Sequence, residues 1–145
     1  SLHDALPIYP GDAAIPVPLF NLVYHDCVMI PWKMEAEEWG IPKGTTGYLQ
    51  CMLNGGMPYL SDTLEGEALM ENIRQVQEIA GLHRRVAMAQ MVSHRFVTED
   101  RSVQETRFSD GTVVTVDFPK GTVQIETVQI ETVQIERDED EHAET

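Results

Sequence analysis

Basic residues are scarce in this chain, which has 10 Lys and Arg against 24 Asp and Glu, for a formal net charge of −14. Residues 121–145 hold −7 of that charge, so the first 120 residues are only moderately acidic. Nucleic-acid binding depends on basic side chains that displace counterions from the phosphate backbone. We therefore expect no nucleic acid as a partner.

Cysteine is also scarce, since only Cys27 and Cys51 occur. A disulfide between them requires Cα atoms within about 7 Å of each other. Two buried free thiols are the favoured interpretation, and the disulfide stays open as the alternative. Neither cysteine stands at zinc-ligand spacing from His25, His83 or His94. The sequence thus predicts no metal site and no cofactor.

Long apolar runs are absent, so no membrane span is expected. No basic segment followed by an apolar stretch marks a signal peptide. The 145 residues allow one ordinary core but fall short of the roughly 250 residues of a complete (β/α)8 barrel. Residues 1–8 resemble a translated sequencing-adapter peptide, so we expect them to be artefactual within an N-terminal extension, 1–15.

An apolar run dominates the next segment, where residues 19–24 are interrupted only by Asn21. Such a run is typical of a strand that is buried on both faces, as in a parallel sheet. Polarity appears abruptly at His25 and Asp26, and Pro31 ends the segment. We predict a loop at residues 31–44.

Two helices are predicted after this loop. The first begins at Thr45 or Thr46 and ends at Asn54, with Gly55-Gly56 as its stop. A short strand is predicted at 57–60, and Ser61 or Asp62 caps a longer helix. Its apolar residues recur at helical spacing: Leu69, Ile73, Val76 and Ile79. The order strand, loop, helix, strand, helix fits the end of an α/β barrel or open α/β sheet.

The periodicity changes near residues 85–90, after which 91–97, 103–108 and 112–118 alternate as strands do. Ser109-Asp110-Gly111 is typical of a hairpin turn. The sequence therefore predicts an antiparallel β module after the α/β part. The fold class is α/β followed by β.

The C-terminal end repeats Thr-Val-Gln-Ile-Glu three times, at 122–126, 127–131 and 132–136. An odd period reverses the face of a strand with each copy, so one continuous strand would not bury the apolar residues consistently. A charged run follows and favours disorder. We interpret 121–145 as a disordered repeat and acidic tail that adds at most one strand to the sheet.

The candidate site is Tyr24, His25 and Asp26, because reacting groups of α/β barrels project from the C-terminal ends of strands. Asp accepts hydrogen bonds from sugar hydroxyls, His and Tyr donate them, and Trp32 offers a ring for stacking. The alternative is structural: an Asp bound by backbone amides, a packed His and a Trp that anchors its loop. Composition alone favours this alternative.

A glycosidase normally needs two carboxylates. Asp26 is the one acid that directly follows a well-supported predicted strand, whereas Glu35, Glu37 and Glu38 lie together in the loop. The catalytic pair therefore cannot be assembled from this chain.

Two blocks, 16–27 and 94–112, resemble segments of large bacterial glycosidases similar to glycoside hydrolase families 101 and 129, the α-N-acetylgalactosaminidase group. The resemblance implies the C-terminal part of a (β/α)8 barrel followed by a truncated β-sandwich. It implies a retaining mechanism with an Asp nucleophile and a Glu acid/base, both from earlier strands. Tyr24, His25 and Asp26 match the late-strand motif and would line the sugar subsite. A secreted, periplasmic or cell-surface location in a bacterium is also implied.

The resulting hypothesis is a glycoside hydrolase fragment with a partial catalytic barrel at 16–85 and a partial β-sandwich at 86–120. It cleaves O-glycosidic bonds of a carbohydrate or glycan only as part of the longer enzyme, because the catalytic pair is missing. The alternative is a non-catalytic carbohydrate-binding or interaction module, which would keep the hairpins and tryptophans and need no acid pair.

Overall fold

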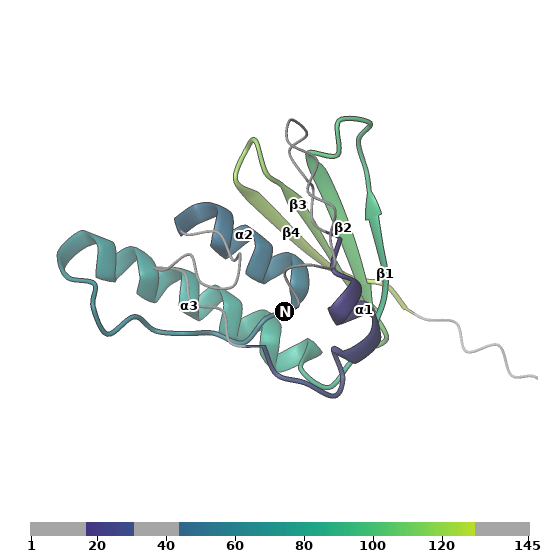
Figure 1. The fold of residues 1–145 in the computed structure, drawn as a ribbon, viewed down its shortest axis with the longest axis horizontal. Coiled ribbons are helices and arrows are strands. Elements are labelled where there is room, and N and C mark those ends of the chain that lie inside the picture. The colour runs from purple at the N-terminus through teal and green to yellow at the C-terminus, as the bar shows by residue number, and fades with distance from the viewer. Residues whose placement is uncertain (1–16, 31–43, 130–145) are drawn as a thin grey trace, which may run out of the picture.

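The computed structural model of the chain describes residues 17–30 and 44–129. Helices come first along the described chain: α1 (Leu19–Tyr24), α2 (Gly44–Asn54) and α3 (Gly66–Val86). The strands follow: β1 (Met91–Phe96), β2 (Val103–Phe108), β3 (Thr112–Asp117) and β4 (Thr122–Thr127). Figure 1 shows α2 between the sheet and α3, with α1 beside β1.

The strand predicted at 19–24 is wrong, because these residues form α1. A strand would bury Asn21, Val23 and His25 on one face. In the structure Asn21 and His25, four positions apart, are buried while Val23 is 65% exposed. A short apolar run does not distinguish a two-sided strand from a helix, and here the spacing of the two buried polar residues selects the helix.

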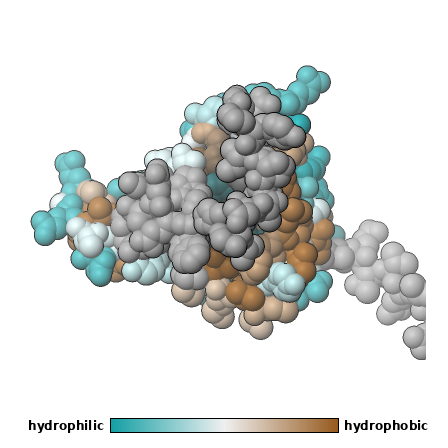
Figure 2. Space-filling view, viewed as in Figure 1, coloured by the Kyte–Doolittle hydropathy of each residue, from teal (hydrophilic) through white to brown (hydrophobic). Residues whose placement is uncertain are grey.

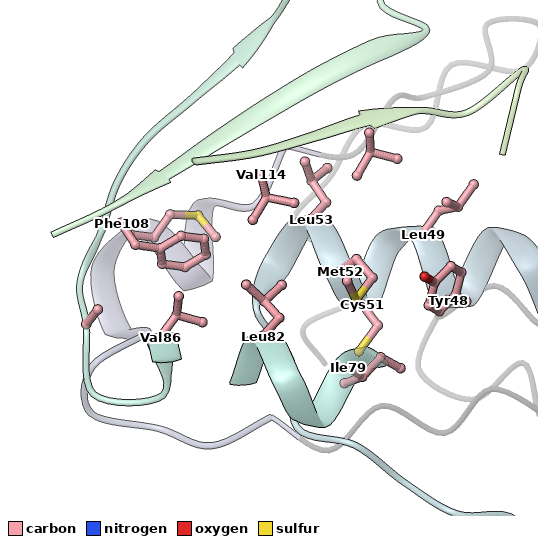
Figure 3. Close-up of a cluster of buried hydrophobic side chains, with 13 residues drawn as sticks. Tyr48, Leu49, Cys51, Met52, Leu53, Ile79, Leu82, Val86, Phe108 and Val114 are labelled. Atoms are coloured by element: carbon pink, nitrogen blue, oxygen red, sulfur yellow. The ribbon is translucent and has the colours of Figure 1, made fainter. Parts of the chain in front are cut away.

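Helix α2 is the centre of the core. Its buried apolar side chains spread over about 200° of the helix circumference: Tyr48, Leu49, Cys51, Met52 and Leu53. This arc is wider than the roughly 100° stripe of a helix that meets a core on one side only. Figure 3 shows Leu53 directed toward Val114 of the sheet and Cys51 directed toward Ile79 of α3. The sequence 44–54 thus specifies a helix enclosed between two layers.

The predicted stop at Gly55-Gly56 is confirmed. The Gly55 N–H donates to the carbonyl of Met52 (3.2 Å), and the Gly56 N–H donates to that of Cys51 (3.0 Å). This is the Schellman pattern, which requires a left-handed residue just beyond the helix. Gly55 supplies it with φ +61°. The two glycines therefore end α2 inside the protein without leaving its last carbonyls unpaired.

Helix α3 buries one stripe at helical spacing: Asn72, Gln75, Ile79, Leu82 and Val86. It begins at Gly66, later than predicted, because the Ser61 hydroxyl accepts from the N–H groups of Thr63 and Leu64 and closes a turn first. The strand predicted at 57–60 is wrong. Within the described part of the chain, Met57 alone of these residues pairs through its backbone with another segment, by one bond to Ile30.

The strands form one antiparallel sheet in the order β1-β2-β3-β4. The three strands predicted between 91 and 118 are confirmed, and so is the hairpin at 109–111. The Asp110 carboxylate accepts from the Thr112 backbone N–H (2.9 Å), and Gly111 has φ +89°. Local side-chain chemistry therefore closes the turn between β2 and β3.

The predicted disorder of 121–145 does not hold for Thr122–Thr127, which form β4 against β3. The backbone pairing of β4 explains the difference, since Val123 and Ile125 fall opposite Val116 and Val114 and share their inward face. This is the single extra strand that the alternation allowed. The rest of the tail from 130 lies outside the described residues.

One hydrophobic cluster joins α2 and α3 to the sheet. The Thr106 hydroxyl of β2 donates to the carbonyl of Leu53 in α2 (2.7 Å) across this interface. The described part of 16–85 contains helices and no parallel strand, and that of 86–120 contributes to one sheet. The described residues therefore show a small fragment of helices on an antiparallel sheet.

Replacing Thr106 with valine should lower the free energy of unfolding by about 1–2 kcal/mol, because the side chain keeps its shape but the buried Leu53 carbonyl loses its donor. Urea denaturation followed by circular dichroism measures the change. Thr115→Val is the matched control, since Thr115 lies half-buried on β3 and has no side-chain hydrogen bond to the described residues. Equal effects of the two substitutions would contradict the assigned role.

Candidate functional site

The three residues predicted to line a sugar site, Tyr24, His25 and Asp26, lie at the C-terminal end of α1 and in the turn that follows. Residues two positions apart on a helix do not face each other. Tyr24 is exposed, Asp26 is half-exposed and His25 is buried. The structure therefore presents Tyr24 and Asp26 on the surface, with His25 between them directed inward.

His25 is only 6% exposed and connects three parts of the fold. Its Nδ1 atom lies 2.7 Å from the carbonyl oxygen of Ala89, and its Nε2 atom lies 3.3 Å from that of Gly55. Its ring packs against Phe108, with 5.0 Å between ring centroids. These contacts hold the end of α1 against the end of α2 and the connection from α3 to β1. His25 thus positions its two neighbours.

The Asp26 carboxylate accepts a hydrogen bond from the thiol of Cys27, with 3.3 Å between Sγ and Oδ1. Hydrogen bonds from the Cys27 and Gln90 side chains hold the pKa of Asp26 below its usual value. The same Cys27 contact raises the pKa of that thiol. Asp26 is therefore ionised at neutral pH and is a hydrogen-bond acceptor at the surface.

Tyr24 belongs to an apolar surface on α1 and the residues after it. The Tyr24 side chain is 49% exposed and packs against Phe20, with 5.1 Å between ring centroids. The other exposed apolar residues are Leu19, Val23, Val28 and Met29. Figure 2 shows hydrophobic surface in the region where Figure 1 places α1. An exposed patch of this kind is typical of a contact with another protein surface or a ligand.

Asn21 was not predicted as a site residue, yet it joins α1 to α2. Its Nδ2 atom donates to Oδ1 of Asn54 (2.6 Å), and its own Oδ1 is buried without a hydrogen-bond partner among the described residues. Asn21, His25 and His83 line a small cavity that admits about one water-sized group. The Asn21 oxygen is thus an available acceptor for a hydroxyl or water. The four-residue spacing from Asn21 to His25 is the signal that could have revealed this inner face.

Trp32 lies outside the described residues, as do Glu35, Glu37 and Glu38. Among the described residues, no group of three or more His, Cys, Asp or Glu side chains is placed to hold a metal ion. Within the same ranges no helix has the length and apolar character needed to cross a membrane.

Both cysteines are free thiols, as predicted, but only Cys51 is buried, so the predicted burial of Cys27 is wrong. Their settings differ, because Cys51 is buried in α2 while Cys27 is exposed. Burial raises the pKa of the Cys51 thiol, so this side chain behaves as a small apolar residue of the core. Neither cysteine contributes to a metal site in the described part of the chain.

Comparison with solved structures identifies the same enzyme repeatedly. The chain is 41% identical to a quadruple mutant of the α-N-acetylgalactosaminidase NagBb from Bifidobacterium bifidum, with a TM-score of 0.65 over 86% of this chain. It is 42% identical to the ligand-free enzyme and to its GalNAc complex, with a TM-score of 0.63 for each over 87% and 81% of this chain.

These matches cover 19% of the NagBb chain, so the described fold corresponds to about a fifth of the solved enzyme. No family model matches the sequence, and a search of curated proteins finds no match. At this level of identity the likeness extends beyond the fold to the sequence itself. The chain is similar to a portion of a glycoside hydrolase.

Proposed function

We propose that this chain is part of a glycoside hydrolase that cleaves O-glycosidic bonds, and that it contributes one wall of the sugar subsite. The observation that carries the proposal is the 41% identity with NagBb over 86% of the chain. The likeness to families 101 and 129 and the arrangement as the end of a (β/α)8 barrel followed by a β-sandwich belong to this proposal. The catalytic carboxylate pair comes from segments other than the described residues.

The substrate class follows from the matched enzyme, which is an α-N-acetylgalactosaminidase and has been solved with GalNAc. We propose a glycan with a terminal α-linked N-acetylgalactosamine as the substrate of the longer enzyme. Sugar recognition requires acceptors for hydroxyl groups and an apolar face for the ring. Asp26 offers the first and Tyr24 the second, and both are accessible.

His25 has a different role in this proposal from its two neighbours. Its ring is enclosed by Phe108 and two backbone carbonyls, so it fixes the end of α1 and leaves substrate contact to Tyr24 and Asp26. Trp32 remains a predicted stacking residue of the same subsite. Removing His25 should therefore lower stability, whereas removing the Asp26 charge should lower substrate recognition.

The test is a chimera in which residues 17–129 replace the matched segment of the Bifidobacterium bifidum enzyme. We expect the chimera to hydrolyse an aryl α-N-acetylgalactosaminide, because the segments share sequence and fold. Asp26→Asn in the chimera should lower kcat/KM by about tenfold to a hundredfold, since a charged hydrogen bond to the sugar is lost. Its melting temperature should stay unchanged.

Asp62→Asn in the same chimera is the matched control, because Asp62 is exposed and has no side-chain hydrogen bond to the described residues. The unfused 145-residue chain is the second control and should show no turnover. A chimera that folds by circular dichroism but hydrolyses no faster than the unfused chain would refute the proposal. Equal kcat/KM for Asp26→Asn and Asp62→Asn would refute the assignment of Asp26.

A further inference from the structure

The outer strand of the sheet is built from a segment that the chain repeats. Strand β4 has the sequence Thr-Val-Gln-Ile-Glu-Thr at 122–127, and the same six residues occur at 127–132. The identity continues further, because residues 122–131 equal residues 127–136 one by one. If the chain moved by five residues along β3, each position of β4 would therefore carry the same type of side chain as before.

The contacts that hold β4 lie within this repeated sequence. Val123 and Ile125 stand opposite Val116 and Val114 of β3, and Val123 packs against the core. The Arg85 guanidinium donates to the hydroxyl of Thr127. After a shift of five residues, Val128 and Ile130 would replace the two apolar residues and Thr132 would replace Thr127. Among the described residues, no contact of β4 distinguishes the two copies.

Strand β4 is also held weakly enough to exchange. Among the described strands it lies at the edge of the sheet and pairs only with β3, and Ile125 is 39% exposed. Edge strands whose register is weakly specified are prone to slippage. The two copies make equal contacts with β3. The free-energy difference between pairing 122–127 and pairing 127–132 therefore comes from the connection after β3.

We propose that the β4 position is a binding site for this repeated strand, and that residues 127–132 exchange with 122–127 at that position. The exchange lengthens the connection after Asp117 from residues 118–121 to residues 118–126. Doubling a loop shifts such an equilibrium about threefold. This inference does not rest on the proposed function.

The present turn adds to the preference for the first copy. The Lys120 N–H donates to the Asp117 carboxylate (3.0 Å), and the Gly121 N–H donates to the carbonyl of Phe118 (3.3 Å). These bonds are released when the longer connection forms. The second copy therefore occupies the site on the order of 5% of the time, with the first copy dominant.

The third copy fits less well. A shift of ten residues would place Arg137 where Thr127 now accepts from Arg85, so two guanidinium groups would meet. The connection would also be longer still. The sequence thus ranks the occupants of the β4 position as first copy, second copy and third copy.

Disulfide trapping in the full chain tests the exchange. Thr115 of β3 stands opposite Gln124 of β4, and Gln129 would stand there after the shift. Directly opposite residues on neighbouring strands bring their Cβ atoms to about 4.5–5.5 Å, which suits a disulfide. In a Cys27→Ser background, Thr115→Cys is combined in turn with Gln124→Cys, Gln129→Cys, Gln134→Cys or Ala143→Cys, and cross-linking under mild oxidation is followed by mass spectrometry.

We expect cross-linking to be fastest for Gln124→Cys, slower for Gln129→Cys and slower again for Gln134→Cys. Ala143→Cys is the matched control for random encounter, because it lies beyond the repeats. Cross-linking of Gln129→Cys at least fivefold faster than Ala143→Cys supports the exchange. Equal rates for these two, a disulfide formed only between two chains, or no cross-link for Gln124→Cys would each overturn it.

Discussion

Replacing Gly55 with alanine should lower the free energy of unfolding by about 3 kcal/mol or more, the largest effect of any single substitution proposed for this fold. Two causes act together. The residue has φ +61°, where a side chain strains the backbone. A Cβ atom would also lie 2.8 Å from Nε2 of His25, 2.9 Å from Cγ2 of Val86 and 3.1 Å from Cζ of Phe108.

The same chain offers controls that separate the two causes. Gly66 has φ +59° but nothing within 4 Å of an added Cβ, so Gly66→Ala should cost about 1 kcal/mol from backbone strain alone. Gly81 lies inside α3 with open space, so Gly81→Ala should stabilise the protein by about 0.5–1 kcal/mol. Urea denaturation of the three variants gives the comparison. A loss for Gly55→Ala no larger than that for Gly66→Ala would contradict the packing of His25 against Gly55.

The sequence predicted the elements whose signals are local. Gly55-Gly56 ended α2, Ser109-Asp110-Gly111 closed a hairpin, and rough alternation marked β1 to β3. Each of these signals acts over a few residues, so it keeps its meaning whatever packs around it. The stripe of α3 was found for the same reason, although the turn at Ser61 delayed its start.

Helix α1 was missed because its conformation depends on residues far along the chain. The apolar run 19–24 suits a buried strand, but the structure exposes most of it and buries Asn21 and His25. Their partners are Asn54, Gly55 and Ala89, which no local pattern connects to them. The predicted orientation of the candidate site was wrong for the same reason, because a strand would have placed Tyr24 and Asp26 on one face.

In the C-terminal repeat the local pattern was correct, but it did not specify which copy pairs with β3. The repeat alternates as a strand, yet three equal copies gave no reason to choose one. The short turn after Asp117 selects the first copy, because only that copy follows β3 at once. Pairing with β3 therefore determines which copy of the repeat forms β4, and composition alone does not.

Replacing Glu105 with glutamine should lower the free energy of unfolding by about 2 kcal/mol at neutral pH. The Glu105 side chain is 8% exposed and accepts from Nε and Nη2 of Arg95, each at 2.8 Å, and from Nε of Arg107 at 2.9 Å. The Arg95 contact, reinforced by Arg107, lowers the pKa of Glu105 from 4.5 to about 2. That difference corresponds to at most about 3 kcal/mol, reduced here because both guanidinium groups are about half exposed.

The stabilisation by the Glu105 charge should decrease as the pH falls. Because the pKa is lower in the folded protein, the stabilisation is complete above about 4.5 and is lost as the pH falls toward 2. The parent chain should therefore lose more stability than Glu105→Gln between these two values, and the curves should converge at the acid end. Glu126→Gln is the matched control, since Glu126 is exposed on the same sheet face and has no ion pair with the described residues. Parallel curves for the parent and Glu105→Gln would show that the two arginines do not stabilise the Glu105 charge.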